Sequence, residues 1–202
     1  MAADGRPTRG RRPAPETREA ARARRGEVAD PEVVLAAAAR LLESRPRSVA
    51  EVRRHLEHAG YAADLIGEVL ARLARLGYLD DDAFARAWIA SRDRAHPRGE
   101  RALRAELMRK GVPRDIVDGA IGERDAADVG DERDAPGGGA GAVDADDRAA
   151  TQLLARRRSS LDRVADPRLR RQRAYALLAR SGFDPDTASR ISERFVRGVE
   201  PV

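Results

Sequence analysis

The 202-residue sequence contains no cysteine, only 3% aromatic residues and no long hydrophobic run. The absence of cysteine excludes disulfide bonds, thiolate catalysis and thiolate metal ligation, and it is typical of proteins from a reducing compartment. The longest apolar run, residues 33–39, ends at Arg40 and is too short for a membrane span or for the core of a signal peptide. These absences predict a cytoplasmic protein without a membrane segment.

Charge is plentiful but unevenly distributed along the chain. The net charge is +4 over residues 1–29, +1 over 30–121, −7 over 122–147 and +7 over 148–202. The first and third of these segments contain almost no large aliphatic side chains. We therefore expect a disordered basic arm at residues 1–29 and a flexible acidic linker at residues 122–147.

One pattern occurs three times in the other two segments: Leu, three residues, Gly, an apolar residue, two residues and Asp. The second copy follows the first by 51 residues and the third follows by 71 more, which indicates that the acidic linker is an insertion. The copies comprise Leu56, Gly60, Tyr61 and Asp64; Leu107, Gly111, Val112 and Asp115; and Leu178, Gly182, Phe183 and Asp186.

Each glycine of the pattern fits the position just after a helix, where the chain turns left-handed and a Cβ is unfavourable. Each aspartate then falls in the first turn of the next helix, where a negative charge faces the positive helix end. The pattern therefore predicts a corner between two helices, with a tight turn at the glycine.

Apolar residues at steps of three and four extend each corner to three helices. No convincing alternation typical of strands is present. The sequence predicts an all-α fold of three tandem three-helix repeats, at residues 30–78, 79–121 and 148–202, in an elongated, curved arrangement. A unit of this size buries only a small core, so we expect the units to support one another by stacking.

Two groups of residues could be interpreted as metal or acid–base sites. The run containing Asp81 and Asp82 is better interpreted as the capped start of the next helix, since Asp is favoured there. His55 and His58 lie on one helix but lack further ligands nearby, which favours a solvated surface. We predict no catalytic residue, no metal site and no cofactor.

Trp88, the only tryptophan, could provide a stacking platform for a nucleic-acid base. Its four-residue spacing from Phe84 favours a core anchor instead.

Several motifs closely resemble the signature of the RecX family of bacterial recombinase regulators. The resemblance is strongest over residues 30–121 and extends to residues 148–197. The matching residues are Arg40, Leu41, Leu42, Arg45, Arg47, Ser48 and Glu51; Gly77, Tyr78, Leu79, Asp80, Asp81, Asp82, Ala83, Phe84 and Ala85; Arg92, Gly99, Leu103, Glu106, Leu107, Lys110, Gly111 and Val112; and Gly182, Phe183 and Asp184.

The resemblance implies a non-enzymatic protein that binds RecA, chiefly in the helical groove of its filament on single-stranded DNA. Members of the family suppress RecA's ATPase, strand-exchange and co-protease activities, and so limit recombination and the SOS response. The third unit, at +7, carries more positive charge than solubility requires, and this favours an acidic or polyanionic partner. The candidate contact residues are Arg92, Arg98, Arg101, Arg104, Arg109 and Lys110, and Arg156, Arg157, Arg158, Arg168, Arg170, Arg171 and Arg173.

Two other classes of protein stay open at this point. A three-helix unit with a glycine turn is also the outline of a helix-turn-helix DNA-binding protein, and a generic helical scaffold would show the same periodicity. We also expect weak direct DNA binding and, because a long heptad pattern is absent, a monomer.

Overall fold

The computed structural model describes residues 17–131 and 144–198, with side chains described for all of these except residues 127–131. The described residues form ten α-helices and no strand, which confirms the predicted all-α class. None of these helices is both long enough and apolar enough to cross a membrane.

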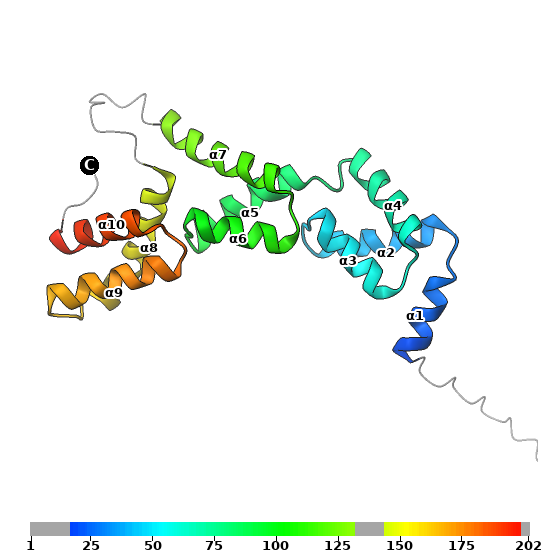
Figure 1. Cartoon of the computed structure of the whole chain (residues 1–202), viewed down its shortest axis with the longest axis horizontal. Helices are drawn as coiled ribbons and strands as arrows, with labels where there is room; N and C mark the ends of the chain where they lie inside the picture. The colour runs from blue at the N-terminus through cyan, green and yellow to red at the C-terminus, as the bar shows by residue number, and fades with distance from the viewer. Residues whose placement is uncertain (1–16, 132–143, 199–202) are drawn as a thin grey trace, which may run out of the picture.

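Nine of the helices described form three three-helix units, and each unit has its own apolar core. Figure 1 shows the units following one another along the long axis of a bent molecule, as predicted from the repeat. The short helix α1 (Arg18–Gly26) precedes them. The units comprise α2 (Pro31–Ser44), α3 (Val49–Ala59) and α4 (Ala63–Arg75); α5 (Asp81–Ala95), α6 (Glu100–Lys110) and α7 (Arg114–Asp131); and α8 (Ala145–Leu161), α9 (Pro167–Arg180) and α10 (Pro185–Arg197).

The repeated glycines end the middle helix of each unit, as the pattern predicts. Gly60, Gly111 and Gly182 have φ angles of 103°, 81° and 87°, all in the left-handed region. Leu56 and Leu107, four residues before the first two glycines, are completely buried, and the backbone N–H groups of Tyr61 and Val112 close the turns onto their carbonyls. The tight turn therefore aims the third helix of each unit back across its core.

The bounds of two predicted segments, the arm and the linker, were wrong. Residues 18–26 of the expected disordered arm form α1, whose N-cap Thr17 accepts a hydrogen bond from Ala20 N–H. Residues 122–131 of the expected linker extend α7, and α8 already begins at Ala145. Arg124 stabilises this extension because its guanidinium lies between Asp93 and Asp146. Residues 1–16 and 132–143 lie outside the described residues.

The first two units meet where α6 ends and α3 begins. The Ser48 hydroxyl donates to the carbonyl of Lys110 at 2.7 Å, and Asp81 Oδ1 accepts from the N–H of Val49 at 2.9 Å. A Cβ built on Gly111 would lie 2.4 Å from the Cβ of Ala50. Only a glycine lets the backbone of this corner approach α3 so closely.

The second and third units meet in the same way, at the start of α6. Gly99 N–H donates to the carbonyl of Ser181 at 3.1 Å, while Asp146 accepts from Glu100 N–H at 3.0 Å. A Cβ built on Gly182 would lie 2.3 Å from the Cβ of Ala102. In both joints a glycine corner therefore packs on the first turn of the preceding middle helix, and an Asp of the following unit caps that turn.

The second joint also contains a buried charge cluster. The side chain of Arg124 is 7% exposed and that of Asp146 9% exposed, and they are joined at 2.7 Å. Burial raises the pKa of Asp146, while the hydrogen bonds from Arg124 and from the Glu100 N–H oppose that rise. Arg156 adds hydrogen bonds to the carbonyls at the end of α5, at 2.5 and 2.6 Å. The third unit is thereby fixed to the second through several polar contacts.

The joints place α3, α6 and α9 end to end, so that the C-terminal end of each later middle helix faces the N-terminal end of the one before it (Figure 1). This arrangement brings the negative end of one helix dipole to the positive end of another, which is favourable.

Replacement of Gly99 tests the close packing of the second joint. A Cβ on Gly99 would lie 2.4 Å from the backbone carbonyl of Gly182, although the φ of −71° is ordinary for any residue. We expect Gly99→Ala to lower the free energy of unfolding by about 1–3 kcal/mol, measured by urea denaturation.

The matched control is Gly119→Ala, because Gly119 lies in α7 with nothing within 4 Å of its Cβ position. It should raise stability by about 0.5–1 kcal/mol through helix propensity. A Gly99→Ala protein as stable as the wild type would contradict the joint geometry.

Candidate functional site

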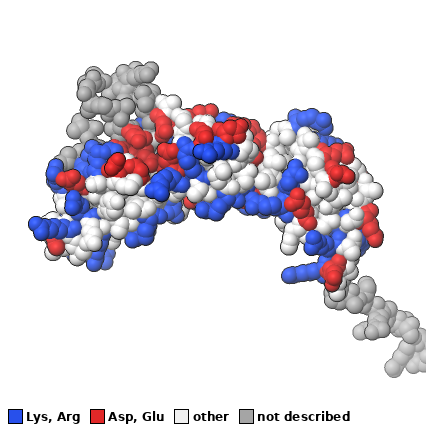
Figure 2. All heavy atoms as spheres, viewed as in Figure 1, with Lys and Arg blue, Asp and Glu red and all other residues white. Residues whose placement is uncertain are grey.

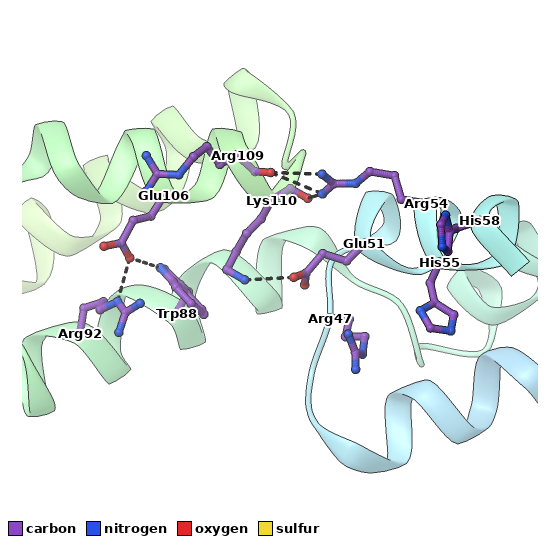
Figure 3. Close-up of a pocket in the computed structure, with 10 residues that line it drawn as sticks. All are labelled: Arg47, Glu51, Arg54, His55, His58, Trp88, Arg92, Glu106, Arg109 and Lys110. Atoms are coloured by element: carbon purple, nitrogen blue, oxygen red, sulfur yellow. Dashed lines mark hydrogen bonds and ion pairs between the residues drawn. The ribbon is translucent and has the colours of Figure 1, made fainter.

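A groove of about 610 Å³ opens on the surface at the first joint, between α3, α5 and α6. Figure 3 shows its side chains converging from the two units. Five of them are cationic and two are carboxylates, so the groove is positively charged overall. The lining residues are Arg47, Glu51, Arg54, His55, His58, Trp88, Arg92, Glu106, Arg109 and Lys110.

Trp88 lies at the centre of the contacts in this groove. Its ring stacks on Phe84 with centroids 6.1 Å apart and packs against the core of the second unit, as predicted for a core anchor. Its Nε1–H donates to Glu106 at 2.9 Å. Lys110 Nζ and the guanidinium carbon of Arg92 lie 4.0 and 4.3 Å from the ring centroid. The ring therefore packs against the core and contacts two cations, and cations are favourable partners for the face of an aromatic ring.

Glu51 links the groove to both units. Its carboxylate completes a capping box with Ser48 and accepts a hydrogen bond from Lys110 at 3.1 Å and another from Arg45 at 3.1 Å. Burial alone would raise the pKa of Glu51, but the hydrogen bonds from Arg45 and Lys110 outweigh burial and lower the pKa to about 2. Glu51 is therefore ionised throughout the physiological range and helps to hold the units together.

Arg54, which sequence reasoning did not select, also closes the first joint. Its guanidinium donates to the carbonyls of Arg109 and Lys110, the last two of α6. These carbonyls have no partner within their own helix, and a cation is favoured beside them. Nothing in the local sequence distinguishes Arg54 from its neighbour Arg53, because the partner carbonyls lie 55 and 56 residues away.

Most of the candidate contact residues in the second unit are engaged within the chain. Arg92 and Arg98 both pair with Glu106. Arg104 pairs with Glu100 and Asp118, and Lys110 pairs with Glu51. By contrast, Arg101 and Arg109 are exposed, and their side chains make no hydrogen bond or ion pair within the described residues.

The candidates in the third unit divide in the same way. Arg156 lies in the second joint, and Arg158 and Arg170 both lie beside Asp162. The exposed side chains of Arg157, Arg168, Arg171 and Arg173 have no such partner in the described part of the chain. Three of these four lie on α9, whose sequence contains no acidic residue.

Five of these exposed arginines without partners lie on α6 and α9, and we call this set the arginine row. Figure 2 shows Lys and Arg along the lower edge of the molecule, where Figure 1 places α6 and α9, while Asp and Glu gather on the opposite edge near α7. In this view Lys and Arg predominate below α6 and α9, and Asp and Glu cluster near α7. The arginine row comprises Arg101, Arg109, Arg168, Arg171 and Arg173.

The acidic run at the start of α5 contains the cap of this helix, as predicted. Asp80 Oδ1 accepts from the N–H of Ala83 at 2.9 Å, and Asp81 caps α3 of the other unit. Burial raises the pKa of Asp81, and the hydrogen bond from Val49 opposes that rise. His55 and His58 are exposed. Within the described residues, no group of three or more His, Cys, Asp or Glu side chains could hold a metal ion.

Family models match both of the first two units. The model of the first three-helix domain of RecX matches residues 35–73, and that of the second three-helix domain matches residues 80–121. Residues of α2, α3 and α4 fall in the first match, and α5, α6 and the start of α7 fall in the second.

Whole proteins are also similar to this chain. "Regulatory protein RecX" of Mycolicibacterium vanbaalenii is 36% identical over 172 residues, which cover 79% of this chain and 84% of the relative. The protein of the same name from Mycobacterium avium is 37% identical over 157 residues, covering 75% and 78% of the two chains. The crystal structure of RecX from Lactobacillus salivarius superimposes with a TM-score of 0.64 at 16% identity, over 81% of this chain and 95% of the other.

The pH dependence of stability tests the role of Glu51. A carboxyl whose pKa is depressed in the folded state stabilises the fold above its unfolded pKa of about 4.5, and that contribution is lost as the pH falls toward 2. We expect Glu51→Gln to destabilise the protein by about 1–2 kcal/mol at pH 7, and we expect the difference from wild type to shrink below pH 4.5. Urea unfolding, followed by the fluorescence of Trp88, measures the free energy of unfolding of both proteins at each pH.

The control is Glu57→Gln, on an exposed position of the same helix. It should change stability little at any of these pH values. If the difference in the free energy of unfolding between the wild type and Glu51→Gln stays constant from pH 7 to pH 2.5, the proposed contribution of the ionised carboxylate is ruled out.

Proposed function

The chain belongs to the RecX family of regulatory proteins, and from this we propose that it binds RecA filaments on single-stranded DNA and inhibits their ATPase, strand-exchange and co-protease activities. It would thereby modulate recombination and the SOS response. We expect it to act in the cytoplasm as a monomer, without enzymatic activity of its own. The family supplies the identity of the partner, and the remaining support comes from the surface of this chain.

The observation that carries the proposal is the arginine row. Its five side chains lie on two helices joined end to end, so they are spread along the length of the molecule. Because these side chains have no partner within the described residues, they are available to carboxylates or phosphates of another molecule. An extended row fits a long partner, and a protein filament on DNA offers acidic protein surface and phosphates over such a length.

The alternative of a helix-turn-helix DNA-binding protein is disfavoured by the charge of the third helices. In that motif, the N-terminal residues of the helix after the turn approach the bases between two phosphate backbones. The corresponding helices here are α4, α7 and α10, and each carries an exposed Asp in its first turn. These carboxylates, Asp64, Asp115 and Asp186, would be repelled by the phosphates.

The direct test is hydrolysis of ATP by RecA on single-stranded DNA. Addition of this protein at a concentration below that of RecA should lower the steady-state rate. A DNA-binding assay without RecA, at the same salt concentration, distinguishes inhibition of the filament from sequestration of the DNA. An unchanged rate at equimolar protein would overturn the proposal.

Charge reversal in the arginine row tests which surface makes the contact. Arg171→Glu should raise the concentration for half-inhibition roughly tenfold, since an attractive and a newly repulsive contact are each worth about 0.5–1 kcal/mol. Arg171 lies near the N-terminal end of α9, where Glu is favoured by the helix dipole, so the fold should tolerate the change.

Arg75→Glu is the matched control for this substitution. Arg75 is exposed in the last turn of α4, outside the arginine row, and the new charge is unfavourable at a helix C-terminus. This control therefore strains the fold at least as much as the test variant does. Equal loss of inhibition from both variants would exclude the arginine row as the specific contact surface.

A further inference from the structure

Each of the three glycine corners packs against an element that precedes its own unit in the sequence. The Cβ position of Gly111 points at Ala50 in the first turn of α3, and that of Gly182 points at Ala102 in the first turn of α6. The Cβ position of Gly60 points at α1, where it would lie 2.7 Å from the backbone carbonyl oxygen of Arg22. Since no unit precedes α2 in the described chain, α1 occupies the place that a preceding middle helix would take.

In all three corners, the last carbonyl before the glycine accepts a hydrogen bond from the element that the corner packs against. Lys110 O accepts from Ser48 and Arg54, and Ser181 O accepts from the N–H of Gly99. Ala59 O, the matching carbonyl of the first unit, accepts from Arg25 Nη1 of α1 at 3.3 Å. A helix end leaves its last carbonyls without partners inside the helix, so each corner needs a donor from outside.

We propose that the Gly60 corner is a third docking surface of the same kind, and that α1 is its dedicated occupant. α1 stands in place of a preceding unit and closes the N-terminal end of the repeat array. Terminal repeats that cover an otherwise open end are a general requirement of such arrays. This role does not depend on whether the protein inhibits RecA.

The other end of the array is closed by different means. The first turns that receive a corner offer a backbone N–H at their first position, Val49 or Glu100, and a small alanine beside it. In α9 the first position is Pro167, which has no N–H, and the next two residues are Arg168 and Leu169. A further unit could therefore neither cap this turn with a carboxylate at its first N–H nor bring a glycine corner close to it, so only the N-terminal end requires an occupant.

Hydrogen exchange of the α1 amides can show whether this helix is docked. It has nine residues and none of them is buried, and isolated helices of this length are marginal in water. Its backbone amides should therefore resist hydrogen exchange only while it is docked at Gly60.

The test is hydrogen–deuterium exchange of the full chain carrying Gly60→Ala, with Gly77→Ala as the matched control. Both glycines have positive φ angles, 103° and 75°, so both variants incur left-handed strain, but only the Gly60 Cβ would meet another element. We expect the amides of residues 20–27 to exchange roughly tenfold faster in Gly60→Ala, as overpacking of the corner displaces α1, and to be unaffected in Gly77→Ala.

A second pair of variants keeps the test decisive if Gly60→Ala fails to fold. Arg25→Ala removes the hydrogen bond to Ala59 O, whereas Arg18→Ala removes an exposed arginine of the same helix that has no hydrogen bond or ion pair in the described structure. Faster exchange of residues 20–27 in Arg25→Ala alone would support the proposal. Unchanged exchange in Gly60→Ala, equal acceleration in Gly77→Ala, or equal effects of Arg25→Ala and Arg18→Ala would each overturn it.

Discussion

The architecture depends on one constraint, which arises where a helix ends in a left-handed glycine. The last carbonyls of that helix need hydrogen-bond donors, and the glycine, which has no Cβ, lets another backbone approach closely. The first turn of another helix can supply the donors and pack closely against the glycine. At Gly111 and Gly182 the same contact satisfies the corner and joins two units. The repeat therefore propagates through its turns, while the apolar cores remain separate within each unit.

Local sequence was sufficient to predict the parts of the fold that depend on neighbouring residues. The glycine and aspartate spacing predicted all three corners, and apolar periodicity predicted the helices of each unit. The joints could not be predicted in this way, because their partners are distant in sequence: Ser48 bonds to a carbonyl 62 residues away, and Glu100 N–H bonds to a carboxylate 46 residues away. Polar contacts of this kind have no periodicity that a sequence pattern could display.

Composition misled the prediction at two places for the same physical reason. Arg124 and Asp146 lie in a stretch whose net charge is −7, which indicated a solvated linker. The two side chains instead neutralise each other in the second joint, where they are almost fully buried. Similarly, twelve arginines and Lys110 were predicted as contact residues, but many of them pair with carboxylates or cap helix ends inside the chain. The availability of an arginine depends on its neighbours in space, and a count along the sequence does not contain this information.

The end-to-end order of α3, α6 and α9 gives the molecule a polarity. Every joint runs in the same sense, with the C-terminal end of the later helix against the N-terminal end of the earlier one, so the two ends of the row are chemically different (Figure 1). A filament of identical subunits assembled head to tail is also polar. The two possible alignments of this molecule along the filament that we propose as its partner are therefore inequivalent, and one of them is the lower in energy.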